Sequence, residues 1–305
     1  LSQDTDVPPG LGFSNSLKFQ CTTADTSVAA DELTLLQQQI AGENLQGFCK
    51  GTSSAKKFTV SFYAKANESR VVSLELSDSD NSRTISQLFT VTADWQRHVL
   101  TFDADTTGAF DNDTNKSMSM IFWLHAGSNF TGGTLNTSWN SNTNANRAAG
   151  IGSLLASTDN NFYITGWQFE VGDHATDFEH IPRDVNLKRC QRYFYNLSSL
   201  GPYVPASEAA YLGAGFYYTS SFVIAMINLP TAMRTEPSLT TSNASNSFMF
   251  YRNGEGDNMD DLSLNGSSSA ICATVQNNTD VSGTAGHAGG LVVQAGTICN
   301  LSAEI

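Results

Sequence analysis

Short segments in which apolar and polar residues alternate limit this chain to folds built from β-strands. The clearest is FTVSFYAK, residues 58–65, where every second residue is apolar. A period of two places successive side chains on opposite faces of a strand. Clusters of turn-forming residues separate such segments, as in DSDNS, residues 78–82. Short strands joined by turns predict an all-β fold, and a β-sandwich rather than βαβ units, which need helices between their strands.

Residues 164–195 join two such β-regions. The first part of this stretch alternates as a strand does, and Gly172 ends it. Farther on, the period changes, because Leu187, Cys190 and Phe194 follow helical spacing. The stretch therefore predicts a strand, a corner and a short connector helix.

At 305 residues the chain is long enough for two domains. The junction places a first β-sandwich at residues 1–182, a connector helix and linker at residues 183–200, and a second β-sandwich at residues 201–305. GTAGHAGG, residues 283–290, is predicted to be a flexible turn. The predicted strands cover residues 17–21, 33–40, 58–65, 71–76, 85–92, 95–102, 118–125, 161–171, 209–218, 222–228, 238–241, 247–251, 270–276 and 297–304.

The string WQFEVGDHATDFEHIP, residues 167–182, followed by KRCQRYFY, residues 188–195, resembles the end of the carbohydrate-binding-module-like jelly-roll domain of bacteriophage tail-fibre and other virion proteins, those of marine phages especially. The resemblance implies a jelly roll in the first domain and a virion setting. It also implies that LTLLQQQI, residues 33–40, is a strand despite its helix-forming residues. PTAMRTEP, residues 230–237, is similar to a segment of phage fibre tip domains, which implies that the second sandwich is a tip. The first resemblance extends upstream through residues 12–24 (GFSNSLKFQCTTA), 56–67 (KKFTVSFYAKAN) and 103–113 (DADTTGAFDND).

Charge and hydropathy exclude several classes of partner. The formal net charge of -13 argues against binding nucleic acid or an anionic membrane surface, since both require a positive face. No run approaches the roughly 18 to 20 apolar residues of a membrane span, so no membrane insertion is expected. The chain begins at Leu1 without a Met or a signal pattern, which suggests a fragment or a processed product.

The five cysteines are odd in number and have no metal-binding spacing, which fits reduced thiols and assembly in a bacterial cytoplasm. Cys272 and Cys299 have two interpretations. Either they pair across neighbouring strands, or both are small buried hydrophobic residues.

A long insertion at residues 127–152 holds the first candidate glycan site. It contains Trp139, whose ring can stack on the C–H face of a sugar, together with Asn136, Asn140 and Arg147, which can hydrogen-bond sugar hydroxyls. The alternative is that Trp139 anchors the insertion to the sandwich and that the asparagines only favour turns.

The second candidate glycan site is an aromatic group in the C-terminal domain. Exposed tyrosines bind partners at little cost in ordering entropy, although alternating tyrosines in strands also serve sheet packing. The candidates are Tyr218, Tyr251 and Arg252, within a group that also includes Tyr203, Tyr211 and Tyr217.

A cluster of carboxylates brackets a glycine turn at residues 103–113. Asp103, Asp105, Asp111 and Asp113 could supply oxygen ligands for a structural calcium ion, which takes six to eight oxygens. The alternative is an acidic surface turn, because the spacing of an EF-hand is absent. No other cofactor is expected, since the five histidines are scattered without an HExxH pattern.

Three functions are compatible with these features. The resemblance implies a virion tail fibre or appendage that is not an enzyme, that adheres to host cell-surface polysaccharide, and that assembles as a homotrimer with other virion subunits. One alternative is a capsid-decoration or purely architectural virion protein. The other is a polysaccharide depolymerase with two carboxylates roughly 5 to 10 Å apart, although the sequence shows no repeat of a β-helix spike.

Overall fold

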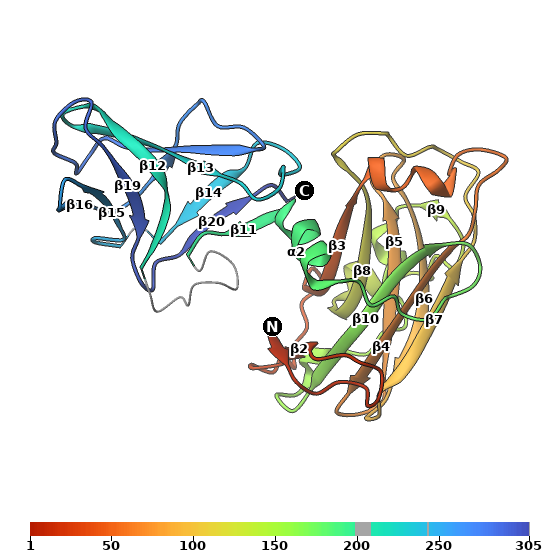
Figure 1. Ribbon diagram of the computed structural model, residues 1–305. Coiled ribbons are helices and arrows are strands. Elements are labelled where there is room, and N and C mark those ends of the chain that lie inside the picture. Colours follow the sequence, from red (N-terminus) through yellow and green to blue (C-terminus); the bar gives the residue numbers. More distant parts are fainter. Residues whose placement is uncertain (199–208, 243, 305) are drawn as a thin grey trace. The chain divides into compact units, whose positions relative to one another are not determined.

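The computed structural model describes the chain except for residues 199–208, 243 and 305 (Figure 1). It divides into two compact units, of which the first extends from Leu1 to His180 and the second from Ile181 to Glu304. Antiparallel sheets form both units and the helices are few and short, so the predicted all-β class is confirmed. No described helix is long and apolar enough to span a membrane.

The first unit is a sandwich of two five-stranded sheets. One sheet has the order β1 (Ser2–Asp4), β2 (Ser16–Gln20), β10 (Asn161–Val171), β4 (Phe58–Ala66) and β7 (Gln96–Phe102). The other has the order β3 (Leu33–Ala41), β8 (Lys116–Ala126), β5 (Arg70–Asp78), β6 (Arg83–Val91) and β9 (Asn140–Ser141).

Strand β4 shows why the two sheets pack together. Its alternate apolar residues Phe58, Val60, Phe62 and Ala64 are all 0% exposed and lie in the core between the sheets. The predicted period of two is therefore confirmed. LTLLQQQI also forms a strand, β3, because backbone pairing with β8 along its whole length outweighs its helix propensity.

The second unit begins with the predicted helix, α2 (Arg183–Gln191). The helix ends before Phe194, which was predicted to continue its spacing but instead begins a strand that pairs with residues 300–302. A seven-stranded sheet follows the order β16 (Glu255–Met259), β15 (Phe248–Arg252), β19 (Ala288–Val293), β12 (Ala210–Thr219), β13 (Phe222–Asn228), β18 (Cys272–Asn277) and β17 (Ser263–Leu264). A three-stranded sheet follows the order β11 (Phe194–Asn196), β20 (Cys299–Ser302) and β14 (Ser238–Thr241).

The prediction of a flexible turn over residues 283–290 is wrong at its C-terminal end, where strand β19 begins. This strand pairs with both β12 and β15. The glycines of β19 are needed because atoms of the neighbouring strands lie too close to leave room for a side chain. A Cβ atom on Gly289 would lie 2.4 Å from the carbonyl oxygen of Tyr251, and one on Gly290 would lie 2.6 Å from the ring of Tyr211. Glycine in a strand can therefore mark a crowded site rather than a turn.

The cysteines are all free thiols, so Cys272 and Cys299 are not paired. Burial raises the pKa of the Cys299 thiol to about 12, whereas Cys190 on α2 is exposed. Because the thiolate is the reactive form, we expect a thiol reagent at neutral pH to modify Cys190 and to leave Cys299 unmodified until the protein is denatured. Peptide mapping by mass spectrometry checks this expectation, and early labelling of Cys299 in the folded chain would contradict it.

Candidate functional site

The insertion at residues 127–152 is folded onto the outer face of the sheet that contains β8. It includes α1 (Ser128–Thr131) and β9, which pairs with β6. Ala148 is fully buried with Ile121 and Trp123 of β8, and Phe130 packs against the same cluster. The insertion is therefore a cover for the sheet, because its apolar residues have a partner surface.

Trp139 lies against the core rather than in solvent. Its Nε1 donates a hydrogen bond to the carbonyl oxygen of Asp103 at 2.7 Å, and its ring centroid lies 5.9 Å from that of Phe58. The Nζ atom of Lys50 lies 5.3 Å from the same ring. These contacts match the alternative interpretation, in which Trp139 anchors the insertion to the sandwich.

Arg147 is also engaged inside the protein. Its guanidinium binds the carboxylate of Glu75, with Nη2 2.8 Å from Oε1, and Trp123 Nε1 donates to Glu75 Oε2 at 3.0 Å. The carboxylate is fully buried, and burial raises its pKa despite these partners. Arg147 therefore neutralises a buried charge. Of the asparagines, Asn136 is buried and donates to Thr84 Oγ1, whereas Asn140 is exposed.

The four aspartates proposed as calcium ligands do not form a common cluster. Asp105 pairs with Lys50 and Arg83, and Asp103 pairs with Lys57. Asp113 accepts hydrogen bonds from Asn115. No three of the four carboxylates lie within the 4.8 Å that would let them share an ion. Ion pairs and hydrogen bonds therefore take up the carboxylates of Asp103, Asp105 and Asp113 separately, while the backbone N–H of Asp111 donates to Asp80.

A polar hollow of about 350 Å³ lies on the first unit, beside the insertion. Its hydroxyl, amide and charged groups can hydrogen-bond a polar ligand, although its lining includes no aromatic side chain. The lining residues are Leu35, Gln37, Ser77, Asp78, Ser79, Ser82, Lys116, Ser119, Ile121, Asn142 and Arg147.

The outer face of the seven-stranded sheet carries a group of apolar side chains, several of them exposed, which we call the tyrosine face. Residues directly opposite one another in antiparallel strands share a face. Tyr251 is opposite Gly290, which is opposite Ala214. The ring of Tyr211 lies over Gly290, so Tyr211 and Tyr251 are neighbours. The face consists of Tyr211, Ala214, Phe216, Ile224, Met226, Met249, Tyr251, Gly290 and Val292.

The rings on this face are open to solvent. Tyr211 is 61% exposed and Tyr251 is 40% exposed. Tyr218 follows Phe216 on β12, is 63% exposed and packs edge-on against Phe222. Exposed amides extend the face at two edges, since Asn258 is opposite Met249 and Asn228 follows Met226 on β13 by two residues. The arrangement offers flat aromatic surface with hydrogen-bonding groups beside it.

The remaining sequence candidates in this unit do not belong to the tyrosine face. Tyr217 is fully buried, and its hydroxyl donates to Asp257. Burial and this hydrogen bond raise the pKa of Tyr217. The guanidinium of Arg252 lies 4.9 Å from the Tyr217 ring and donates to the carbonyl oxygen of Ser282. Tyr203 lies outside the described residues.

Sequence reasoning missed Phe216 and Met226 as members of an exposed surface. The signal was present, because YLGAGFYY and FVIAMIN are apolar at nearly every position rather than at every second one. A strand that is apolar on both faces has either two covered faces or one exposed apolar face.

No family model matches the chain, and no curated protein sequence matches it. Solved structures with some similarity include carbohydrate-binding modules and a phage tailspike domain. A CBM4 structure is 14% identical with a TM-score of 0.27, over 48% of this chain and 66% of that chain. The enzymatically active domain of tailspike protein 4 from bacteriophage CBA120 is 14% identical with a TM-score of 0.31, over 56% of this chain and 17% of that chain.

A tandem CBM22 pair from Paenibacillus barcinonensis Xyn10C is 8% identical with a TM-score of 0.27, over 100% of this chain and 91% of that chain. The chain thus spans about two thirds of the CBM4 structure and a small part of the tailspike domain. TM-scores between 0.27 and 0.31 do not establish common ancestry or a common ligand. The chain's own residues therefore carry the proposals that follow.

Proposed function

We propose that this chain is a non-enzymatic glycan-binding protein and that the tyrosine face of its second unit is the binding surface. The observation that carries the proposal is the pair of neighbouring exposed tyrosines, Tyr211 and Tyr251, on this face, with the exposed Tyr218 farther along β12. Aromatic faces stack on the C–H surface of sugar rings, and tyrosine adds a hydroxyl that can hydrogen-bond the same sugar.

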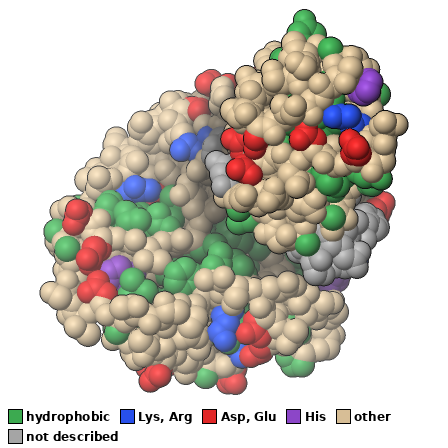
Figure 2. Space-filling model, turned by 90° about the vertical axis from the view of Figure 1, so that its left-hand side faces the viewer, with side chains coloured by type: hydrophobic (Ala, Val, Ile, Leu, Met, Phe, Trp, Pro, Cys, Tyr) green, Lys and Arg blue, Asp and Glu red, His purple; other side chains and the backbone are tan. Residues whose placement is uncertain are grey.

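Charge limits the class of glycan. The chain carries a formal net charge of -13, and acidic side chains are more prominent than basic ones on the face of the molecule drawn in Figure 2. All the side chains assigned to the tyrosine face are uncharged. A neutral polysaccharide therefore suits this surface better than a sulfated or phosphorylated one, which the net charge would repel.

The sequence resemblance supports a setting for this activity. In that setting the chain is part of a bacteriophage tail fibre or another virion appendage, assembles as a homotrimer in the bacterial cytoplasm, and adheres to host surface polysaccharide. Three weak sites on one particle would bind a polymer much more tightly than one site, because later contacts form at high effective concentration. The architectural alternative uses the same apolar face to pack against other virion subunits.

The first test compares the native chain with the double variant Tyr211→Ala/Tyr251→Ala in affinity gel electrophoresis against a panel of soluble neutral polysaccharides. Each aromatic anchor of a binding site contributes about 2 kcal/mol. The double variant should therefore lose about 4 kcal/mol and bind a retained polysaccharide roughly 1,000-fold more weakly. Folding should persist, because both rings are at least 40% exposed, and circular dichroism checks it.

Phe194→Ala is the matched control, since Phe194 is 41% exposed on the separate three-stranded sheet. Equal retardation of the native chain, the double variant and the control would exclude the tyrosine face. A further variant, Gln37→Ala/Asn142→Ala, would then test the polar hollow of the first unit. If no polysaccharide retards the native protein, the glycan proposal is wrong and the architectural role remains.

A further inference from the structure

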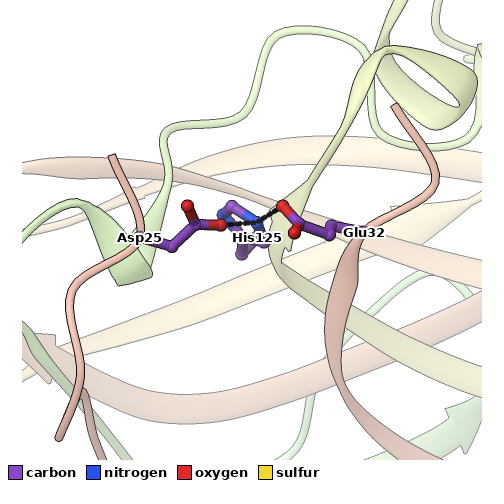
Figure 3. A group of neighbouring side chains, drawn as sticks. All are labelled: Asp25, Glu32 and His125. Carbon is purple, nitrogen blue, oxygen red and sulfur yellow. Dashed lines mark ion pairs between the residues drawn. The ribbon is translucent and has the colours of Figure 1, made fainter. Parts of the chain in front are cut away.

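A loop of the first unit carries two carboxylates to a buried imidazole. His125 lies near the end of β8 and is 1% exposed. The loop at residues 22–32 precedes β3, and its backbone is fixed on both sides of the imidazole. The N–H of Asp25 donates to the carbonyl of Leu155 at 2.7 Å, and the N–H of Gly127 donates to the carbonyl of Glu32 at 2.8 Å. Figure 3 shows Asp25 and Glu32 pointing at His125 from opposite sides.

The three side chains converge on a small volume. His125 Nε2 lies 3.7 Å from Asp25 Oδ2 and 3.9 Å from Glu32 Oε2. The three potential ligand atoms all lie within 4.8 Å of one another. Neither distance from Nε2 is short enough for a hydrogen bond. Accordingly, Nε2 is a buried nitrogen that has no hydrogen-bond partner.

The second nitrogen of the ring is held in place. His125 Nδ1 lies 2.6 Å from Ser153 Oγ, which also accepts the N–H of Leu155. When Nδ1–H donates to this hydroxyl, the lone pair of Nε2 points toward the two carboxylates. Metal-binding histidines are oriented in this way, with the other ring nitrogen hydrogen-bonded to a neighbouring group.

Both carboxylates are suited to bind a cation. Asp25 Oδ1 accepts the N–H of Ser27 at 2.9 Å. Glu32 Oε2 accepts the N–H of Ala29 at 2.7 Å. Asp25 thus fixes the loop with Oδ1 and faces the imidazole with Oδ2, whereas Glu32 Oε2 does both and would bind a cation through its remaining lone pairs. Two negative groups beside an unpartnered imidazole nitrogen favour a positive charge between them.

We propose that Asp25, Glu32 and His125 form a binding site for one divalent transition-metal cation of the zinc class. One imidazole nitrogen with two carboxylate oxygens suits zinc, whereas calcium and magnesium prefer oxygen ligands alone. Tetrahedral zinc with bonds of about 2.0–2.2 Å requires ligand atoms roughly 3.3 Å apart. The observed 3.7 and 3.9 Å would therefore close by only a few tenths of an ångström.

The site has a route to solvent and leaves a coordination position open. The side chains of Asp25 and Glu32 are 27% and 43% exposed, while the imidazole beneath them is buried. A metal ion would enter from the carboxylate side and keep at least one water molecule. It would fasten the loop at residues 22–32 to strand β8. This role is independent of glycan binding by the second unit.

The test is equilibrium dialysis of the chelator-treated full chain against zinc chloride, with bound zinc measured by mass spectrometry. The native chain should bind zinc stoichiometrically. Asp25→Asn/Glu32→Gln keeps the shape and removes both negative charges, so it should lose this binding. Ser153→Ala, which frees the imidazole, should weaken zinc binding roughly 10- to 100-fold. The melting temperature should rise with zinc in the native chain and stay constant in the double variant.

The matched control is Asp173→Asn/His174→Gln, which removes an exposed Asp–His pair at the surface of the same unit. This control should bind zinc as the native chain does. The proposal is overturned if the native chain binds no zinc. It is also overturned if Asp25→Asn/Glu32→Gln binds as well as the native chain, or if only the control loses zinc.

Discussion

Lys50→Ala should lower the free energy of unfolding of the first unit by about 3–5 kcal/mol, because it leaves buried carboxylates without their cation. Lys50 is 3% exposed, and its Nζ lies 2.6 Å from Asp78 Oδ2 and 3.1 Å from Asp105 Oδ2. It also donates to the carbonyl oxygens of Thr107 and Gly108. Urea denaturation followed by tryptophan fluorescence measures this effect on the first unit, since all four tryptophans lie there.

Lys57→Ala is the control for this prediction. Lys57 Nζ lies 3.2 Å from Asp103 Oδ1, but both side chains are about half exposed or more. A surface pair of this kind contributes about 0–1 kcal/mol. If Lys50→Ala and Lys57→Ala unfold at the same urea concentration, the ion pairs of Lys50 with Asp78 and Asp105 do not stabilise the unit.

The buried ion pairs around Lys50 also make the stability of the first unit depend on pH. Burial acts to raise the pKa of Asp105, but hydrogen bonds from Arg83, Thr107 and Lys50 outweigh it and lower the pKa below its ordinary value of 3.8. A lowered pKa in the folded state stabilises the fold above the ordinary value, and this contribution is lost as the pH falls through the folded value. The difference in unfolding free energy between the native chain and Lys50→Ala should therefore become smaller in acid.

Arg147→Ala should have an effect of similar size, about 3–5 kcal/mol, because Glu75 would remain buried without a counter-charge. Glu75 is 0% exposed and keeps only the Trp123 hydrogen bond when the guanidinium is gone. The insertion would also lose the contact that fixes Arg147 to β5. The same urea titration measures this variant, and Trp123 in the affected cluster makes fluorescence sensitive to it.

Adding Glu75→Gln to Arg147→Ala separates charge from packing. The amide oxygen of Gln still accepts from Trp123 but carries no charge, so the double variant should be more stable than Arg147→Ala alone. Burial raises the pKa of Glu75, so its ionised form costs stability as the pH rises above the ordinary value of 4.5. The loss of unfolding free energy caused by Arg147→Ala should therefore be smallest in acid. Adding Glu75→Gln should remove this dependence on pH. A double variant no more stable than Arg147→Ala would show that packing, not charge, dominates.

Local patterns predicted the parts of the fold that depend on neighbouring residues. The alternation of residues 58–65 gave strand β4, and the helical spacing of Leu187 and Cys190 gave α2. These signals are local because the faces of a strand or helix follow from residues two to four positions apart. By contrast, Gly289 and Gly290 looked like a turn, because the rings that they accommodate lie on other strands.

The sequence by itself determined the all-β class, the core face of β4 and the acidic net charge. Only the tertiary structure decided which polar and aromatic side chains are free to act. Arg147 meets Glu75 across 72 positions of sequence, and His125 meets a loop that lies about 100 positions earlier. Whether a Trp, Tyr or Arg side chain is exposed or already engaged depends on such distant contacts. A local pattern identifies the chemistry of a side chain, whereas its surroundings are set by strand order and register.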